Sequence, residues 1–169
     1  IMDPESTVDL PAKDPHVPEV EFRNVSFSYL GKTKNLDAIS FTLYPGQTLG
    51  IMGATGSGKS TLTRLLLRQY EADEGEILLR GVNIKHLRPK DIRSLFGIVF
   101  QNDFLFSGTV RENIAFGRDI SDDELERATR YAQAEEFLAE KEGGLDFPLT
   151  SNGMYLSGWE NQWLLLSRS

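Results

Sequence analysis

The chain has 169 residues, of which 40% are hydrophobic and 25% charged, a composition typical of a globular domain with its own core. It has no cysteine, which excludes disulfides and thiolate metal sites and fits a reducing compartment. Its net charge of -7 disfavours a nucleic-acid-binding surface, and no apolar run approaches the roughly 20 residues that cross a bilayer.

A proline-rich segment opens the sequence. Four prolines stand among charged and small residues between positions 4 and 18, which is typical of an extended linker without a core. Apolar residues then recur over 20–27 and over 38–43. The first range predicts a strand or paired strands, and the second predicts another strand, which ends at the turn Tyr44-Pro-Gly46.

The most informative motif lies at Gly53–Ser60, where the sequence GATGSGKS matches the P-loop pattern G-x-x-x-x-G-K-[ST]. In such a loop, backbone N–H groups surround phosphate oxygens, a lysine adds positive charge, and a hydroxyl is placed for Mg²⁺. The apolar run Thr48–Met52 predicts a buried strand before the loop, and Ser60–Gln69 predicts a helix after it. The motif therefore predicts a nucleotide-binding protein.

Short elements follow the P-loop. Residues 76–79 and 96–100 predict two strands, and Pro89–Leu95 predicts a helix with proline in its first turn.

The rest of the chain is helical in character. Ser121-Asp-Asp-Glu124 is a capping box and predicts a helix start, with Ile120 and Leu125 at the spacing of a hydrophobic staple. Gly143-Gly144 predicts a break, and a last segment begins near Ser157.

Four further features surround the P-loop in the sequence: Tyr29 before it, Gln101 at the end of a predicted strand, the segment Asn102–Ile114, and Tyr155-Leu-Ser-Gly158. Together with the P-loop they resemble the nucleotide-binding domain of an ATP-binding-cassette (ABC) transporter of the exporter type. The resemblance implies an α/β fold, with a P-loop NTPase core, an antiparallel β subdomain and a helical subdomain over about 102–160. It makes 1–18 a linker from the membrane domain and 19–169 the N-terminal portion of the nucleotide-binding domain.

The resemblance also assigns roles to single residues. Tyr29 is similar to the aromatic residue that stacks on adenine. Lys59 and Gln101 are similar to the residues that act in catalysis, and Ser60 and Gln101 to the ligands of Mg²⁺. The full set implied to bind ATP is Tyr29, Gly53, Thr55, Gly56, Ser57, Gly58, Lys59, Ser60 and Thr61. The alternatives are a tyrosine that only packs in its strand and a glutamine in a solvated loop.

The stretch Phe104–Ile114 is similar to the surface on which the membrane domain docks in the family. We expect Phe104, Leu105 and Phe106 to be exposed there, although as isolated residues they would more often belong to a core.

Ser157 and Gly158 belong to a signature-like motif, which in the family reaches the γ-phosphate held by a second nucleotide-binding domain. In this chain Trp159 replaces a glycine and Glu160 adds negative charge, and both changes oppose that contact.

The sequence stops at Ser169, before the region that carries the family's Mg²⁺-binding aspartate, catalytic glutamate and switch histidine. We therefore expect an ATP-binding domain at the cytoplasmic face of a membrane, whose parent protein couples MgATP binding and hydrolysis to export. We expect this chain alone to bind ATP without hydrolysing it, and its sheet to need completion by another chain or by further sequence.

Three alternatives stay open. The altered signature favours the degenerate, non-hydrolysing half of a heterodimeric transporter, and a misread sequence from Tyr155 onward would also account for it. A soluble ABC ATPase that works on DNA or ribosomes is disfavoured by the linker, by Phe104–Ile114 and by the acidic charge.

Overall fold

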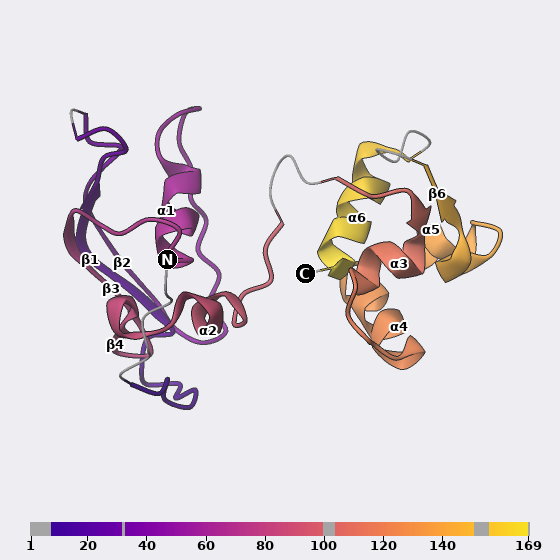
Figure 1. Cartoon of the computed structure of the whole chain (residues 1–169), viewed down its shortest axis with the longest axis horizontal. Helices are drawn as coiled ribbons and strands as arrows, with labels where there is room; N and C mark the ends of the chain where they lie inside the picture. The colour runs from indigo at the N-terminus through magenta and orange to yellow at the C-terminus, as the bar shows by residue number, and fades with distance from the viewer. Residues whose placement is uncertain (1–7, 32, 100–103, 151–155, 169) are drawn as a thin grey trace. The chain divides into compact units, whose positions relative to one another are not determined.

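A four-stranded antiparallel sheet organises the first of two units in the structure, a computed structural model that describes residues 8–31, 33–99, 104–150 and 156–168. Unit 1 spans Ile1–Leu95 and unit 2 spans Phe96–Ser169 (Figure 1). The sheet has the strand order β2-β1-β3-β4. Its strands are β1 (Val20–Phe27), β2 (Leu36–Leu43), β3 (Glu74–Leu79) and β4 (Val82–Asn83).

The strand β1 lies between two partners. Val20 pairs with Leu43 of β2 on one side and with Leu79 of β3 on the other. Phe22 is buried and stacks on Phe41 of β2, with ring centroids 4.5 Å apart. Alternating apolar residues thus build a sheet with one buried face, and the strands predicted over 20–27, 38–43 and 76–79 are confirmed.

Helix α1 (Lys59–Leu66) follows the P-loop and buries Thr61, Leu62 and Leu65. It is shorter than predicted, because Leu67 forms the C-cap and Arg68 adopts a left-handed backbone conformation with φ 52°. The remaining elements of unit 1 are the 3₁₀ turn η1 (Ile84–His86) and helix α2 (Pro89–Arg93), which begins at proline as predicted.

Two predicted strands are wrong. Residues 48–52 form no strand, and Met52 is 96% exposed, while Leu49 and Ile51 are also exposed. Residues 96–99 form no strand either, and Phe100 lies outside the described residues. A strand is stable only when a neighbour completes its hydrogen-bond ladder, and no described strand pairs with either segment.

Unit 2 is mainly helical. It contains α3 (Val110–Ala115), α4 (Asp122–Tyr131), α5 (Glu135–Ala139), η2 (Gly144–Asp146) and α6 (Gly158–Arg168). A short antiparallel pair joins β5 (Gly108–Thr109) to β6 (Pro148–Leu149). None of the described helices has the length and apolar character that crossing a bilayer requires.

The helices of unit 2 enclose a single hydrophobic cluster among the described residues. Its buried members are Leu105, Val110, Ile114, Leu125, Ala134, Phe137, Leu138, Leu149, Leu164 and Leu165. The predicted exposure of Leu105 is therefore wrong: its side chain points into this core, whereas Phe104 and Phe106 on either side of it are exposed.

Local sequence patterns explain where α4 begins. The Ser121 hydroxyl accepts a hydrogen bond from the Glu124 N–H, and the Glu124 carboxylate accepts one from the Ser121 N–H, which confirms the predicted capping box. Ile120 and Leu125 both pack in the core of unit 2, as the staple spacing predicts. Further along, Gly143 adopts φ 95° after α5 and opens η2.

Candidate functional site

The P-loop is a turn that leads directly into α1. The Ser57 N–H donates to the Ala54 carbonyl at 3.1 Å, and Gly56 adopts φ 83°. The first turn of α1 has no side-chain cap and no acidic residue. The Thr61 N–H donates to the Gly58 carbonyl at 2.9 Å, but the N–H groups before it have no helical carbonyl to bond and are therefore suited to an anion such as phosphate.

Gly58 shows why this loop needs glycine. It is the N-cap of α1 and has φ 92°, a conformation that other residues rarely adopt. A Cβ at this position would also lie 2.6 Å from the Asn35 carbonyl oxygen and 2.8 Å from Leu36 Cδ2. Close contact between the loop and the start of β2 thus fixes the direction in which α1 leaves the loop.

Lys59 folds back over the loop that precedes it. Its ammonium donates hydrogen bonds to the carbonyl oxygens of Gly53 and Ala54, each at 2.8 Å. An ammonium has three donors, and no described residue accepts the third. The cation is therefore held at the mouth of the loop with a donor left for a phosphate oxygen. Ser60, the next residue, is exposed.

Tyr29 lies just beyond β1 and contacts α1. Its hydroxyl group shares a 3.2 Å hydrogen bond with Thr61 Oγ1 and accepts a second one, also 3.2 Å, from the Arg64 guanidinium. Its ring meets the rings of Phe27 and Tyr70 edge to face, at 4.9 and 5.1 Å between centroids. The structure therefore brings Tyr29 next to the P-loop helix, although the two segments are far apart in the sequence.

Burial and hydrogen bonding act in opposite directions on Tyr29. Partial burial raises the pKa of its phenol, but the hydrogen bonds with Thr61 and Arg64 lower it more, so that the net pKa lies below the ordinary value.

Other predicted residues are only partly described. Gln101, predicted as a catalytic residue and Mg²⁺ ligand, lies outside the described residues, and so does Tyr155. Within the described ranges, no three His, Cys, Asp or Glu side chains come together to form a metal site.

The signature-like segment holds an arrangement that the sequence analysis missed. The Glu160 carboxylate accepts a hydrogen bond from the Ser157 N–H at 2.5 Å, and the Ser157 hydroxyl accepts one from the Glu160 N–H at 3.3 Å. Lys141 forms an ion pair with Glu160 at 3.4 Å. The S-x-x-E spacing of a capping box was already visible in the sequence. Glu160 therefore caps α6 and engages the groups of Ser157 that a phosphate would need.

Because Glu160 caps α6 as a carboxylate, we expect its contribution to the stability of the fold to depend on pH. Hydrogen bonding from Ser157 lowers the pKa of Glu160 despite partial burial, and Lys141 lowers it further. A carboxylate with a lowered pKa stabilises the folded state above its unfolded pKa, and this effect is lost as the pH falls through the folded pKa. We expect Glu160→Ala to lower the free energy of unfolding by about 1 kcal/mol at neutral pH, the typical contribution of one hydrogen bond, and by little in acid.

Urea unfolding, followed by tryptophan fluorescence, measures this effect well because both tryptophans of the chain, Trp159 and Trp163, lie in α6. Glu160→Gln is the matched control, since glutamine can accept the same hydrogen bond and loses only the charge. Equal stability of the wild type and Glu160→Ala at neutral pH would show that the cap does not contribute.

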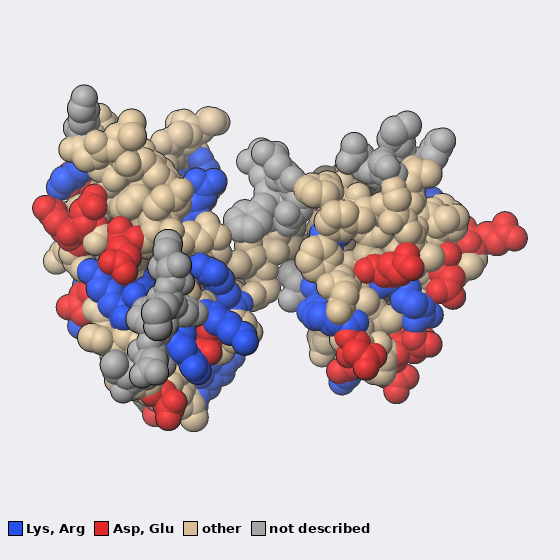
Figure 2. Space-filling model, in the orientation of Figure 1, with Lys and Arg blue, Asp and Glu red and all other residues tan. Residues whose placement is uncertain are grey.

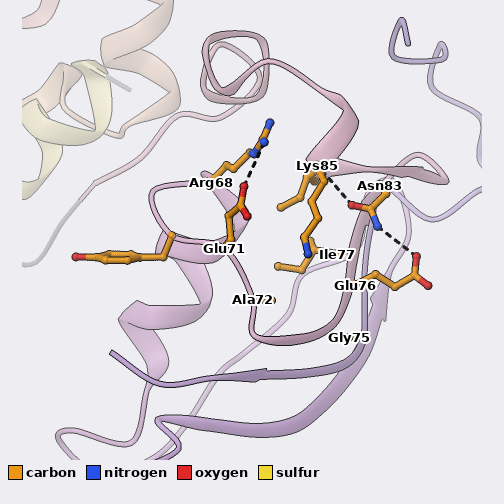
Figure 3. Close-up of a pocket in the computed structure, with 10 residues that line it drawn as sticks. Arg68, Glu71, Ala72, Gly75, Glu76, Ile77, Asn83 and Lys85 are labelled. Carbon is orange, nitrogen blue, oxygen red and sulfur yellow. Dashed lines mark hydrogen bonds and ion pairs between the residues drawn. The ribbon is translucent and has the colours of Figure 1, made fainter. Parts of the chain in front are cut away.

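A small pocket in unit 1 offers no competing site. Arg68 binds Glu71, and the Asn83 side chain accepts from the Lys85 N–H and donates to Glu76 (Figure 3). The cavity is about 10 Å³, which is barely enough for one water molecule. No residue of the P-loop lines it.

The comparison with known families agrees with this geometry. A family model described as "ABC transporter" matches residues 36–169, which is most of the chain.

The chain belongs to the ABC transporter family.

Known members of the family match nearly all of this chain. It is 42% identical over 162 residues to "ABC transporter B family member 6" of Dictyostelium discoideum, and this alignment covers 90% of this chain and 24% of that protein. It is 40% identical over 154 residues to an "ATP-dependent lipid A-core flippase" of Vibrio vulnificus, and this alignment covers 89% of this chain and 26% of that protein. The chain thus spans about a quarter of the length of these curated relatives.

A solved structure supports the same conclusion. The chain resembles a bacterial Atm1-family ABC exporter with ATP bound, with a TM-score of 0.81 and 36% identity over 97% of this chain and 30% of the exporter chain. The predicted family and the predicted α/β fold of the ABC exporter nucleotide-binding domain, with its antiparallel sheet, are confirmed.

Proposed function

We propose that this chain is the ATP-binding domain of an ABC exporter, whose parent protein couples MgATP binding and hydrolysis to transport across a membrane. The observation that carries the proposal is the loop Gly53–Gly58, with the Lys59 ammonium held over it at the uncapped start of α1. Backbone donors, positive charge and a helix dipole there all favour a polyphosphate. Tyr29, beside the same helix, is the proposed platform for adenine.

Mg²⁺ is the cofactor that accompanies ATP in this proposal. The exposed Ser60 hydroxyl directly after Lys59 is an oxygen donor of the kind that Mg²⁺ prefers, and Gln101 is the proposed second ligand. When bound, Mg²⁺ supplies positive charge to the β- and γ-phosphate oxygens.

The proposed docking surface for the transmembrane domain is Phe104–Ile114. Phe104 is 53% and Phe106 44% exposed, and their rings meet at 4.9 Å, although Leu105 and Ile114 are buried. An exposed aromatic pair of this kind is typical of a protein-interaction surface. The domain would then lie at the cytoplasmic face of the membrane.

The second proposed partner is another nucleotide-binding domain, and the proposal includes no nucleic acid. Acidic and basic side chains are mixed on the face of unit 2 that Figure 2 shows, and the net charge of the chain is -7. A surface for nucleic acid would instead need clustered Lys and Arg.

A second candidate function is a nucleotide-binding half that does not hydrolyse ATP. The observation that favours it is the contact between Glu160 and Ser157, because the Glu160 carboxylate accepts from the Ser157 N–H while the Ser157 hydroxyl accepts from the Glu160 N–H. A phosphate from a partner domain would have to displace this like charge.

We expect the polypeptide of these 169 residues to release no phosphate from ATP above background. The sequence has no apolar run that leads into an acidic pair and could supply a general base, whose help is commonly worth about 10²–10⁴-fold in rate. Steady-state phosphate release from the wild type and from Lys59→Ala is the measurement. Release by the wild type that disappears in Lys59→Ala would contradict the expectation, since it would assign turnover to this P-loop.

A further inference from the structure

We propose that Arg64 is a positioning residue for base recognition and that it acts by holding the hydroxyl group of Tyr29. The proposal rests on the proposed function, in which the Tyr29 ring stacks on the base of the nucleotide. It adds that the tyrosine hydroxyl group and an arginine on α1 set the orientation of that ring.

The first observation is the pair of hydrogen bonds at the Tyr29 hydroxyl. Arg64 donates to it and Thr61 Oγ1 lies at the same distance, 3.2 Å in both cases. A guanidinium can only donate, so the phenolic proton can be given to Thr61. Thr61 and Arg64 are three residues apart and therefore lie on one face of α1. The side chains of Thr61 and Arg64 thus hold the Tyr29 hydroxyl group from α1, the helix that follows the P-loop.

The second observation is the aromatic contact at the other end of the side chain. Phe27 and Tyr70 meet the Tyr29 ring at interplanar angles of 84° and 88°. A tyrosine has two rotatable side-chain bonds, and contacts at the ring and at the hydroxyl together restrict both. Tyr29 is still 38% exposed, which leaves surface for a base. The ring is therefore preorganised, and preorganisation improves affinity by reducing the entropy lost on binding.

The third observation concerns the charge of Arg64. The side chain is exposed, and within the described residues it forms no ion pair with a carboxylate. Its described polar contact is with an uncharged phenol, so it can act through Tyr29 without breaking an ion pair. Removing Arg64 should consequently affect the tyrosine without unfolding unit 1.

The test compares two ligands that differ in the nucleoside. ATP carries adenine and ribose, whereas inorganic tripolyphosphate offers only the phosphate chain. We expect Arg64→Gln to weaken MgATP binding by about three- to tenfold, the range that the loss of one hydrogen bond gives. Tyr29→Phe removes the hydrogen bonds with both Arg64 and Thr61 and should weaken binding at least as much. Both variants should bind tripolyphosphate within about twofold of the wild type, because the phosphate site is unchanged. Isothermal titration calorimetry on the full chain measures both affinities.

A double variant separates positioning from other roles. If Arg64 acts through the Tyr29 hydroxyl group, Tyr29→Phe combined with Arg64→Gln should lose no more affinity for ATP than Tyr29→Phe alone. Additive losses would overturn the proposal, and so would a loss of tripolyphosphate affinity in Arg64→Gln, which would mean that Arg64 contacts phosphate directly. Arg127→Gln, an exposed position on α4, is the control for the loss of one positive charge.

The outcome also distinguishes this inference from the proposed function. A wild type that binds neither ligand would overturn both. A wild type that binds ATP through Lys59 but is unaffected by Arg64→Gln and Tyr29→Phe would overturn only the role of Arg64.

Discussion

Replacing Lys59 by alanine is expected to lower the affinity for ATP by about 10- to 100-fold, which corresponds to the loss of a charge-assisted hydrogen bond to phosphate. The Lys59 ammonium donates hydrogen bonds to the carbonyl oxygens of Gly53 and Ala54 and keeps a third donor for the ligand. Alanine removes that donor and its charge, while α1 should persist because alanine is a good helix former. Calorimetric titration with MgATP gives the two affinities.

Lys90→Ala is the matched control for this prediction. Lys90 is an exposed lysine in α2 of the same unit, and it has no part in the P-loop. Its replacement should leave ATP affinity unchanged within about twofold. A loss of similar size in both variants would mean that overall charge, and not the position of Lys59, governs binding.

The second large effect is expected in the core of unit 2. Leu164 is fully buried, and its side chain belongs to the hydrophobic cluster that α3, α4, α5 and α6 enclose. Leu164→Ala removes buried methyl groups and leaves a cavity, and such changes cost about 2–5 kcal/mol. We expect the free energy of unfolding to fall by an amount in that range, measured by urea unfolding with tryptophan fluorescence.

Leu166 lies on the same helix and provides the comparison. Its side chain is 49% exposed, so Leu166→Ala should cost well under half as much as Leu164→Ala. Similar losses in the two variants would show that α6 does not pack with Leu164 facing the core of unit 2.

Features that depend on neighbouring residues in the chain were predictable from the sequence. The P-loop, the strand over 20–27 and the capping box at Ser121 all follow from short patterns, since glycines, alternation and S-x-x-E act locally. The structure has β1, the helix after the P-loop and the capping box of α4 where these patterns predict them. The cap of Glu160 on Ser157 has the same local origin and could have been predicted in the same way.

Features that depend on distant residues were not predictable. The run Thr48–Met52 is apolar enough for a strand, but a strand also needs a paired neighbour, which a local pattern does not reveal. Leu105 was expected at the surface with its two phenylalanine neighbours, yet the fold of unit 2 buries it. The contact between Tyr29 and Arg64 joins residues 35 positions apart, and only the packing of α1 against the end of β1 creates it.

The proposed ATP site can be tested by observing which backbone amides respond to ATP. We predict that titration of the isotopically labelled chain with MgATP shifts the amide resonances of Gly53–Thr61 most, because those N–H groups would surround the phosphates in the proposed site. Amides of α4, in the other unit, should change little. If the resonances of Gly53–Thr61 do not shift at any ATP concentration, or if only amides elsewhere in the chain shift, the proposed ATP site is contradicted.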